Sequence, residues 1–213
     1  MVIKLKNLAK TSQYFWKYRH LVDFSIWSRY LASADEAHRA FYPLFVKSEG
    51  MASIFEFGCA SGPNLKRVLS ECDLEFFFGV DINRKAIQIA RNQEWSCSTC
   101  FHTELEPDIL RSTLLEHDKL RFDLGIYDRV LYLLDADETH RHFESVTPML
   151  STVLIDDFHS DSHESNGVYH SKNYEKILSR FGFVLQTSEI SQHLIRDDFF
   201  KNCAKRLVFR RGA

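Results

Sequence analysis

Residues 53–65 read SIFEFGCASGPNL, and this stretch decides the fold we expect for the rest of the chain. It begins as a short apolar strand that carries Glu56 and runs into a loop of small residues, 58–62. Gly58 and Gly62 can adopt positive φ angles, and small residues let the backbone approach a ligand closely. The stretch therefore predicts a strand, a tight turn and a ligand-contacting loop.

A helix is expected directly after this loop, opened by Pro63 or Asn64. Proline is tolerated in a first helical turn because an N–H there has no intrahelical partner, and asparagine is a good N-cap. The free N–H groups and positive dipole of such a helix start favour an anionic group.

A second strand is predicted at residues 76–80, FFFGV, and it ends at Asp81. Three consecutive phenylalanines without polar alternation fit a parallel strand covered on both faces. Asp81 stands about twenty residues beyond the glycine loop, where doubly wound folds hold a carboxylate for the two hydroxyls of a ribose. The pattern predicts a nucleoside-type cofactor.

The composition of the chain limits which classes of protein it can belong to. The chain has 213 residues, of which 45% are hydrophobic and 26% charged, enough for one well-buried α/β core. The net charge of -2 argues against general nucleic-acid binding. No apolar run approaches the ~20 residues of a membrane span, and the N-terminus does not resemble a secretory signal. We expect a cytoplasmic protein.

Five cysteines are scattered through the predicted core elements. An odd number in such positions is typical of reduced thiols in a cytoplasmic protein. Cys97 and Cys100 form a single C-x-x-C pair in a predicted strand, without a second pair at zinc spacing, so packing is the favoured interpretation.

A single domain is predicted over residues 1–213, with a helical leader at 1–49 and a cofactor-binding α/β core at 50–213. The leader is basic and rich in aromatic residues. Ser33 and Glu36 fit a capping box that would open a helix through about Val46.

The motif Glu56-Phe57-Gly58-Cys59-Ala60-Ser61-Gly62-Pro63-Asn64, followed by Asp81, resembles motif I of the class I S-adenosylmethionine-dependent methyltransferases. That family usually has glycine where this chain has Ala60, and alanine keeps a close approach where its φ is negative. The resemblance implies a doubly wound, Rossmann-like, seven-stranded and mostly parallel sheet with an antiparallel last strand and N-terminal helices as a cap. It also implies S-adenosylmethionine as cofactor.

The same resemblance assigns cofactor contacts. Ile82 would lie against the adenine face, and Glu104 would accept the adenine amino group. Tyr127 would stand at the end of the fourth strand, beside the transferable methyl group, with a helix beginning at Val130. The full set of predicted cofactor residues is Glu56, Gly58, Cys59, Ala60, Ser61, Gly62, Asn64, Asp81, Ile82, Glu104 and Tyr127.

Candidate catalytic residues are His159, Asp128 and Asp157, at the ends of two predicted strands. Methyl transfer from a sulfonium mainly requires an aligned acceptor, and an alcohol also benefits from a base. His159 is the side chain whose ordinary pKa suits that role. We expect O-methylation of a small molecule or saccharide, without nucleic acid or a membrane span among the partners, and a homodimer stays open.

Three alternatives remain at this point. Asp128, Asp156 and Asp157 resemble the carboxylates of Mg²⁺-dependent sugar or catechol O-methyltransferases, although Arg129 offers them a salt bridge instead, and no metal site is favoured. The chain could also be a non-catalytic S-adenosylmethionine-binding partner protein. A nicotinamide enzyme would need glycines at 58, 60 and 63, and only the first is present.

Overall fold

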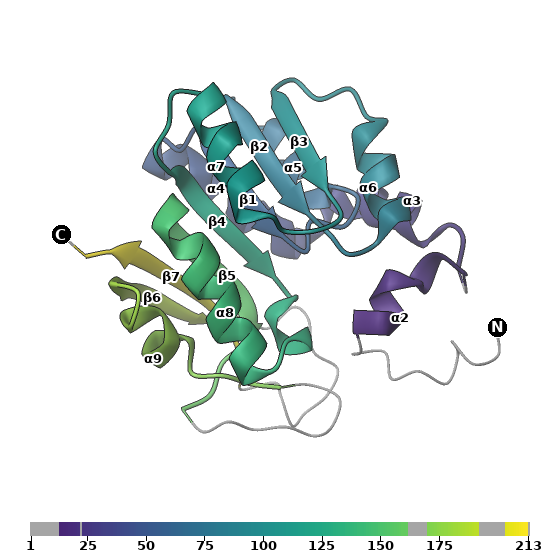
Figure 1. Cartoon of the computed structure of the whole chain (residues 1–213). Coiled ribbons are helices and arrows are strands. Elements are labelled where there is room, and N and C mark those ends of the chain that lie inside the picture. Colours follow the sequence, from purple (N-terminus) through teal and green to yellow (C-terminus); the bar gives the residue numbers. More distant parts are fainter. Residues whose placement is uncertain (1–12, 22, 162–169, 192–202, 213) are drawn as a thin grey trace. The chain divides into compact units, whose positions relative to one another are not determined.

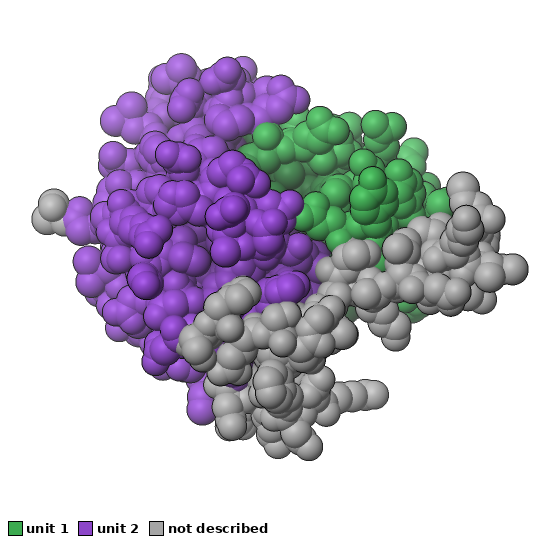
Figure 2. Space-filling model, turned by 60° about the horizontal axis from the view of Figure 1, so that its bottom comes forward, with its two compact units in different colours: residues 1–105 green, residues 106–213 purple. Residues whose placement is uncertain are grey.

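The structure is a computed structural model that describes residues 13–21, 23–161, 170–191 and 203–212. The chain divides into two compact units, residues 1–105 and 106–213, which Figure 2 colours separately. Seven strands follow the sheet order β3-β2-β1-β4-β5-β7-β6 (Figure 1). Neighbours pair in parallel in β1–β2, β2–β3 and β4–β5, whereas β7 is antiparallel to both β5 and β6. The predicted fold class is confirmed, while the single domain stays a prediction.

The first unit alternates strands with helices after a helical leader. Its elements are α2 (Gln13–Lys17), η1 (Arg19–Leu21), α3 (Ile26–Ala32), η2 (Ser33–Asp35), η3 (Ala37–Ala40), α4 (Phe41–Glu49), β1 (Ser53–Phe57), α5 (Pro63–Leu69), β2 (Phe76–Val80), α6 (Arg84–Arg91) and β3 (Ser98–His102). All five residues of β2 are buried, which confirms a strand covered on both faces.

The predicted capping box at Ser33 is wrong. Residues 33–35 form a short 3₁₀ turn, and the Ser33 hydroxyl donates to the Tyr30 carbonyl at 2.7 Å instead of capping a helix. The helix begins eight residues later, at Phe41, and ends at Gly50, whose φ of 62° closes it in the left-handed region. Ser33 is the C-cap residue of the preceding helix, α3. A residue type that commonly starts helices therefore ends one here.

The second unit contains the remaining strands. Its elements are α7 (Pro107–Glu116), β4 (Phe122–Asp128), η4 (Leu131–Leu133), α8 (Ala136–Val146), η5 (Thr147–Met149), β5 (Leu150–Phe158), α9 (Tyr174–Ser179), β6 (Phe183–Ile190) and β7 (Ala204–Arg211). Within the described residues, none of the helices of either unit is long and apolar enough to cross a membrane.

The helix predicted to begin at Val130 is also corrected. Residues 131–133 make a 3₁₀ turn, and the following helix, α8, starts at Ala136. Asp135 and Glu138 form its capping box, since the Asp135 carboxylate accepts the Glu138 N–H at 2.7 Å and Glu138 accepts the Asp135 N–H at 2.8 Å.

Candidate functional site

The turn after β1 is held in a conformation that few side chains tolerate. Gly58, Ala60 and Gly62 have φ angles of 79°, 50° and 86°. The N–H groups of Gly58 and Cys59 both donate to the Val80 carbonyl, at 2.7 and 3.0 Å, which ties the turn to the end of β2. Ala60 therefore does not have the negative φ on which its family match depended. A left-handed alanine costs about 1–2 kcal/mol, and such strain persists where surrounding structure enforces it.

Asp81 is the group that enforces this turn. One carboxylate oxygen accepts the Ala60 N–H at 2.9 Å, and the other accepts the Asn83 N–H at 2.8 Å. Burial raises the pKa of the Asp81 carboxyl to about 6, against the lowering effect of those two hydrogen bonds. Each carboxylate oxygen has a second lone pair, and the residue is only partly covered, so Asp81 can accept further hydroxyl groups.

Glu56 belongs to a buried polar chain beneath the loop. The Asn64 amide donates to the Glu56 carboxylate at 2.7 Å, and Arg39 donates to the Asn64 carbonyl oxygen at 2.7 Å. Arg39, Asn64 and Glu56 are only 3%, 2% and 1% exposed. Asn64 is therefore a bridge between β1 and the leader, while Gly62 occupies the N-cap position of α5 and Pro63 its first turn.

The leader is also hydrogen-bonded to the loop, through Ser61, and to the start of α6, through Asn83. The Ser61 hydroxyl donates to the Trp27 carbonyl at 2.7 Å. The Asn83 amide donates to the carbonyls of Trp16 and Lys17, at 2.7 and 3.0 Å. Trp27 is 2% exposed and packs in one cluster with Ala60. Trp16, Lys17 and Trp27 of the leader therefore contact the loop or the start of α6 directly.

The predicted cofactor residues of this unit fall into two groups. Buried side chains with internal roles form the first group: Glu56, Cys59, Ala60, Ser61, Gly62 and Asn64. Accessible or partly accessible positions form the second: Gly58, Asp81, Ile82 and Glu104. The second group is thus accessible enough to contact a ligand. The residues of the first group are buried and support the backbone of the loop.

In the second unit, Asp128 and Asp156 are paired with arginines. The Arg129 Nε lies 3.1 Å from the Asp128 carboxylate, and the Arg206 Nη2 lies 2.8 Å from that of Asp156. Burial, and then the negative charge of Asp128, raise the pKa of Asp156. Arg129 itself has a φ of 52°, and its N–H donates to the Asp156 carbonyl at 2.8 Å. The ends of β4 and β5 are thus joined by this backbone hydrogen bond, while the ion pair of Asp156 links β5 to β7.

Asp157 accepts backbone donors. One of its oxygens accepts the N–H groups of Leu131 and Tyr132, at 2.7 and 3.2 Å, and the other accepts the Phe158 N–H at 2.7 Å. Burial raises its pKa to about 6. Buried Lys172 donates to the Leu131 carbonyl at 2.8 Å, so both groups hold the 3₁₀ turn after β4.

His159 is 7% exposed, and its Nδ1 accepts the Tyr174 N–H at 3.3 Å. A neutral imidazole that accepts at Nδ1 carries its proton on Nε2 and presents a donor there. Burial, reinforced by Lys205, lowers the His159 pKa. This hydrogen-bond pattern opposes a proton-accepting role for His159.

Tyr127 lies in the core of the second unit. Its ring is fully buried, and its hydroxyl lies 3.1 Å from the His142 Nε2. Burial lowers the pKa of His142 to about 3, so the imidazole is neutral. A cofactor contact at position 127 would have to come from the backbone.

Sequence reasoning missed Arg39, Asn83 and Lys172. Each is buried and polar, and each bonds across a long stretch of chain, so no local pattern marks it. Among the described residues, no group of three or more His, Cys, Asp or Glu side chains is arranged to hold a metal ion.

Solved structures resemble this chain over most or all of its length. A magnesium protoporphyrin IX methyltransferase from Synechocystis PCC 6803 with bound SAH, 14% identical, has a TM-score of 0.68 over 95% of this chain and 100% of the other. The plantazolicin methyltransferase BpumL, in complex with a triazolic desmethylPZN analog and SAH, is 14% identical, with a TM-score of 0.62 over 100% of both chains. The N-methyltransferase NodS from Bradyrhizobium japonicum WM9 is 19% identical, with a TM-score of 0.57 over 84% and 99%. No protein-family model matches the sequence, and no curated protein does.

These likenesses establish the fold. The chain has the fold of the class I S-adenosylmethionine-dependent methyltransferases, as the resemblance of residues 56–64 implied.

Proposed function

We propose that this protein is an S-adenosylmethionine-dependent methyltransferase that methylates an oxygen of a small molecule or saccharide. The observation that carries the proposal is Asp81, whose two oxygens hold the strained turn at Ala60 while keeping lone pairs for a ligand. Structures of the same fold contain SAM or SAH, which supports the choice of cofactor.

The residues fit a nucleoside cofactor. Asp81 would accept the ribose hydroxyls, the Gly58 backbone would lie against the cofactor, and Ile82 would cover the adenine. A side chain at Gly62 would be strained, because its φ is 86° and its Cβ would lie 3.2 Å from two ring carbons of Trp95, closer than ordinary contact. Position 62 thus favours glycine.

The bound sulfonium would supply an already activated methyl group. The chain's contribution is then alignment of donor and acceptor, which can account for a large part of a barrier. Because Nε2 of His159 carries the proton, we propose that His159 orients an acceptor oxygen by donating to it. We propose that Asp128, at the end of β4, and Asp157, near the end of β5, stabilise these two strand ends. His159 follows β5 directly.

The magnesium-dependent alternative is less well supported. Its three carboxylates already have protein donors: Asp128 with Arg129, Asp156 with Arg206, and Asp157 with backbone N–H groups. A divalent ion needs several oxygen ligands facing one point, and these carboxylates are directed to separate partners.

The test has two stages. Calorimetry of the full chain with SAH should show saturable binding, which Asp81→Asn weakens at least ~10-fold by removing charged hydrogen bonds. Asp73→Asn, a control in the same unit outside the loop, should bind as wild type. Absence of SAH binding by the wild-type chain would refute the proposal.

The second stage separates an enzyme from a non-catalytic binding protein. Labelled S-adenosylmethionine is incubated with hydroxylated small molecules and saccharides, with and without a chelator. Transfer that survives chelation supports the proposal, and transfer abolished by chelation would favour the magnesium alternative. Tight SAH binding without transfer to any acceptor would favour the partner-protein alternative.

A further inference from the structure

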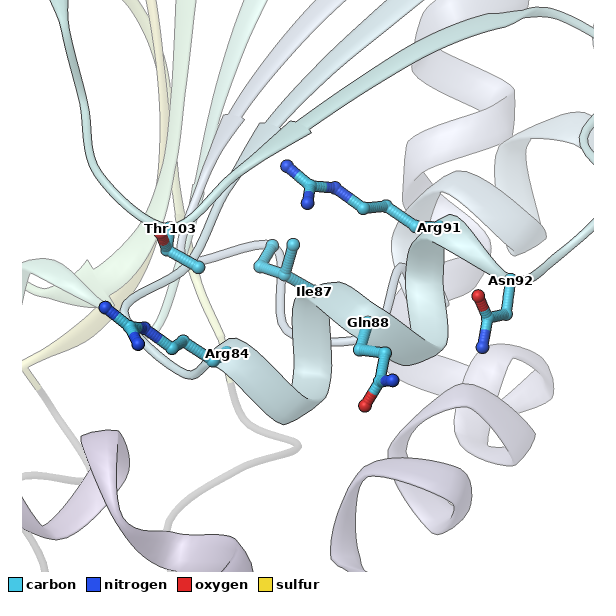
Figure 3. Close-up of a pocket in the computed structure, with 6 residues that line it drawn as sticks. All are labelled: Arg84, Ile87, Gln88, Arg91, Asn92 and Thr103. Atoms are coloured by element: carbon cyan, nitrogen blue, oxygen red, sulfur yellow. The ribbon is translucent and has the colours of Figure 1, made fainter.

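A second site is suggested by an open pocket along α6. It is lined by Arg84, Ile87, Gln88, Arg91 and Asn92 of this helix region and by Thr103, which follows β3 (Figure 3). Its volume of about 320 Å³ is at the lower end of the range for small-ligand sites. All lining residues belong to the first unit, so the pocket is complete within it.

The pocket is strongly biased toward positive charge. Its lining has two arginines and no carboxylate, and α6 carries Arg84, Lys85 and Arg91 without an acidic residue. The whole chain, by contrast, has a net charge of -2. Asp81 and Glu94 flank α6 in sequence and exposed Glu104 follows Thr103, but none of the three lines the pocket. With three cationic side chains among its eight residues, α6 is thus much more positively charged than the chain as a whole.

The polar groups of the pocket are mostly donors. Arg91 directs Nε, at 3.0 Å, and Nη2 to the Phe101 carbonyl, which fixes its guanidinium beside β3 and leaves Nη1 for a ligand. The Gln88 carbonyl oxygen accepts from Lys85 at 3.0 Å, and its side chain projects from α6 away from the two arginines (Figure 3). Buried Ile87 supplies an apolar floor.

Arg84 is the least constrained of these groups. Within the ranges that the structure describes, its side chain makes no hydrogen bond or ion pair. In the close-up, Arg84 and Arg91 both project from α6 toward the side on which Thr103 lies (Figure 3). The two residues are seven apart, two turns or about 10 Å along the helix, so they stand on the same face of α6, and both line the pocket.

We infer that this pocket binds the phosphate or pyrophosphate group of a small ligand. Guanidinium groups present planar, paired donors that match phosphate oxygens, and an acceptor-poor lining selects an anion without protons to donate. The competing interpretation is a solvated basic helix face, which would have no saturable affinity. The inference is independent of methyl transfer, because it uses none of the proposed cofactor contacts.

Inorganic pyrophosphate is the probe. Calorimetry of the full chain should show saturable binding that weakens as sodium chloride is raised. Arg84→Gln should weaken it about 10-fold, the scale of one charged hydrogen bond. Arg141→Gln, an exposed arginine on α8, should leave it unchanged. Arg84→Gln should also keep wild-type SAH affinity, so failure of this proposal and of the proposed function are read separately.

Three outcomes would overturn the inference. The first is the absence of saturable pyrophosphate binding by the wild-type chain. The second is equal affinity of wild type and Arg84→Gln, or displacement of pyrophosphate by SAH, which would place the anion elsewhere. The third is that a single-stranded oligonucleotide binds more tightly than pyrophosphate, with an affinity that increases with oligonucleotide length. That result would assign the basic face to nucleic acid. Arg91→Lys adds a check on geometry, since it keeps the charge but loses the paired donors, and should also weaken binding.

Discussion

Asp81 in the first unit and the pair Asp156 and Asp157 in the second differ in how far their carboxylates are buried and in what they bond. In the first unit, Asp81 uses each oxygen once, for a backbone N–H, and stays partly accessible. In the second, Asp156 and Asp157 are 1% and 3% exposed, one bound by Arg206 and the other by three backbone N–H groups. A carboxylate at a strand end can therefore either stay accessible to a ligand or be used up in stabilising the turn beside it.

The largest effect is expected at the turn of the first unit. Gly58→Val puts a β-branched residue at a φ of 79°, which should cost several kcal/mol and lower SAH affinity more than ~100-fold. Calorimetry and thermal unfolding measure the two effects. Gly182→Ala is the matched control in the second unit, with a φ of 78° and open space around it. It should lower stability but leave SAH affinity unchanged, and near-normal SAH binding by Gly58→Val would show that the ligand lies elsewhere.

The next effect concerns Arg39. Arg39→Met removes the donor to Asn64 and should lower the free energy of unfolding by about 2–3 kcal/mol, the scale of a buried hydrogen bond made by a charged group. Urea unfolding gives this value. Arg180→Met, at an exposed position, should change it by less than about 0.5 kcal/mol. An equal response of the two variants would mean that the buried chain from Arg39 to Glu56 contributes nothing.

The third prediction uses pH. In the proposed function Asp81 accepts the ligand's hydroxyl groups as a carboxylate, and its pKa in the folded chain is about 6. SAH affinity should therefore be constant above about pH 7 and fall as the pH drops through 6. Asp81→Asn, which has no charge to lose, should bind weakly and without this dependence. Parallel pH profiles for the two proteins would remove Asp81 from the site.

The smallest effect is expected in the core of the second unit. Tyr127→Phe removes the hydroxyl that faces His142 and should cost about 1 kcal/mol of stability. It should not change SAH affinity, because the ring is fully buried. A marked loss of SAH affinity in a fully folded variant would restore a cofactor contact for the Tyr127 side chain.

Much of the fold could be predicted from local pattern. The strands at 53–57 and 76–80 follow from buried apolar runs, and the turn between β1 and α5 follows from its small residues. Ser33 shows the limit of such patterns. A serine followed by glutamate fits a helix start, but whether the chain continues as a helix depends on what the flanking turns pack against.

The sequence by itself determined the strand, the small-residue turn after it and the second strand that ends at Asp81, because glycine and short apolar runs act through local backbone geometry. The cofactor roles of this loop and of Asp81 stay predictions. Only the tertiary structure decided that Arg39 and Asn83 tie the leader to these segments, and that Lys172 holds the 3₁₀ turn after β4. It also decided that Asp157 and Tyr127 bond to protein groups. Such partners lie 15 to 67 residues away along the chain, and long-range hydrogen bonds of buried polar groups leave no local pattern.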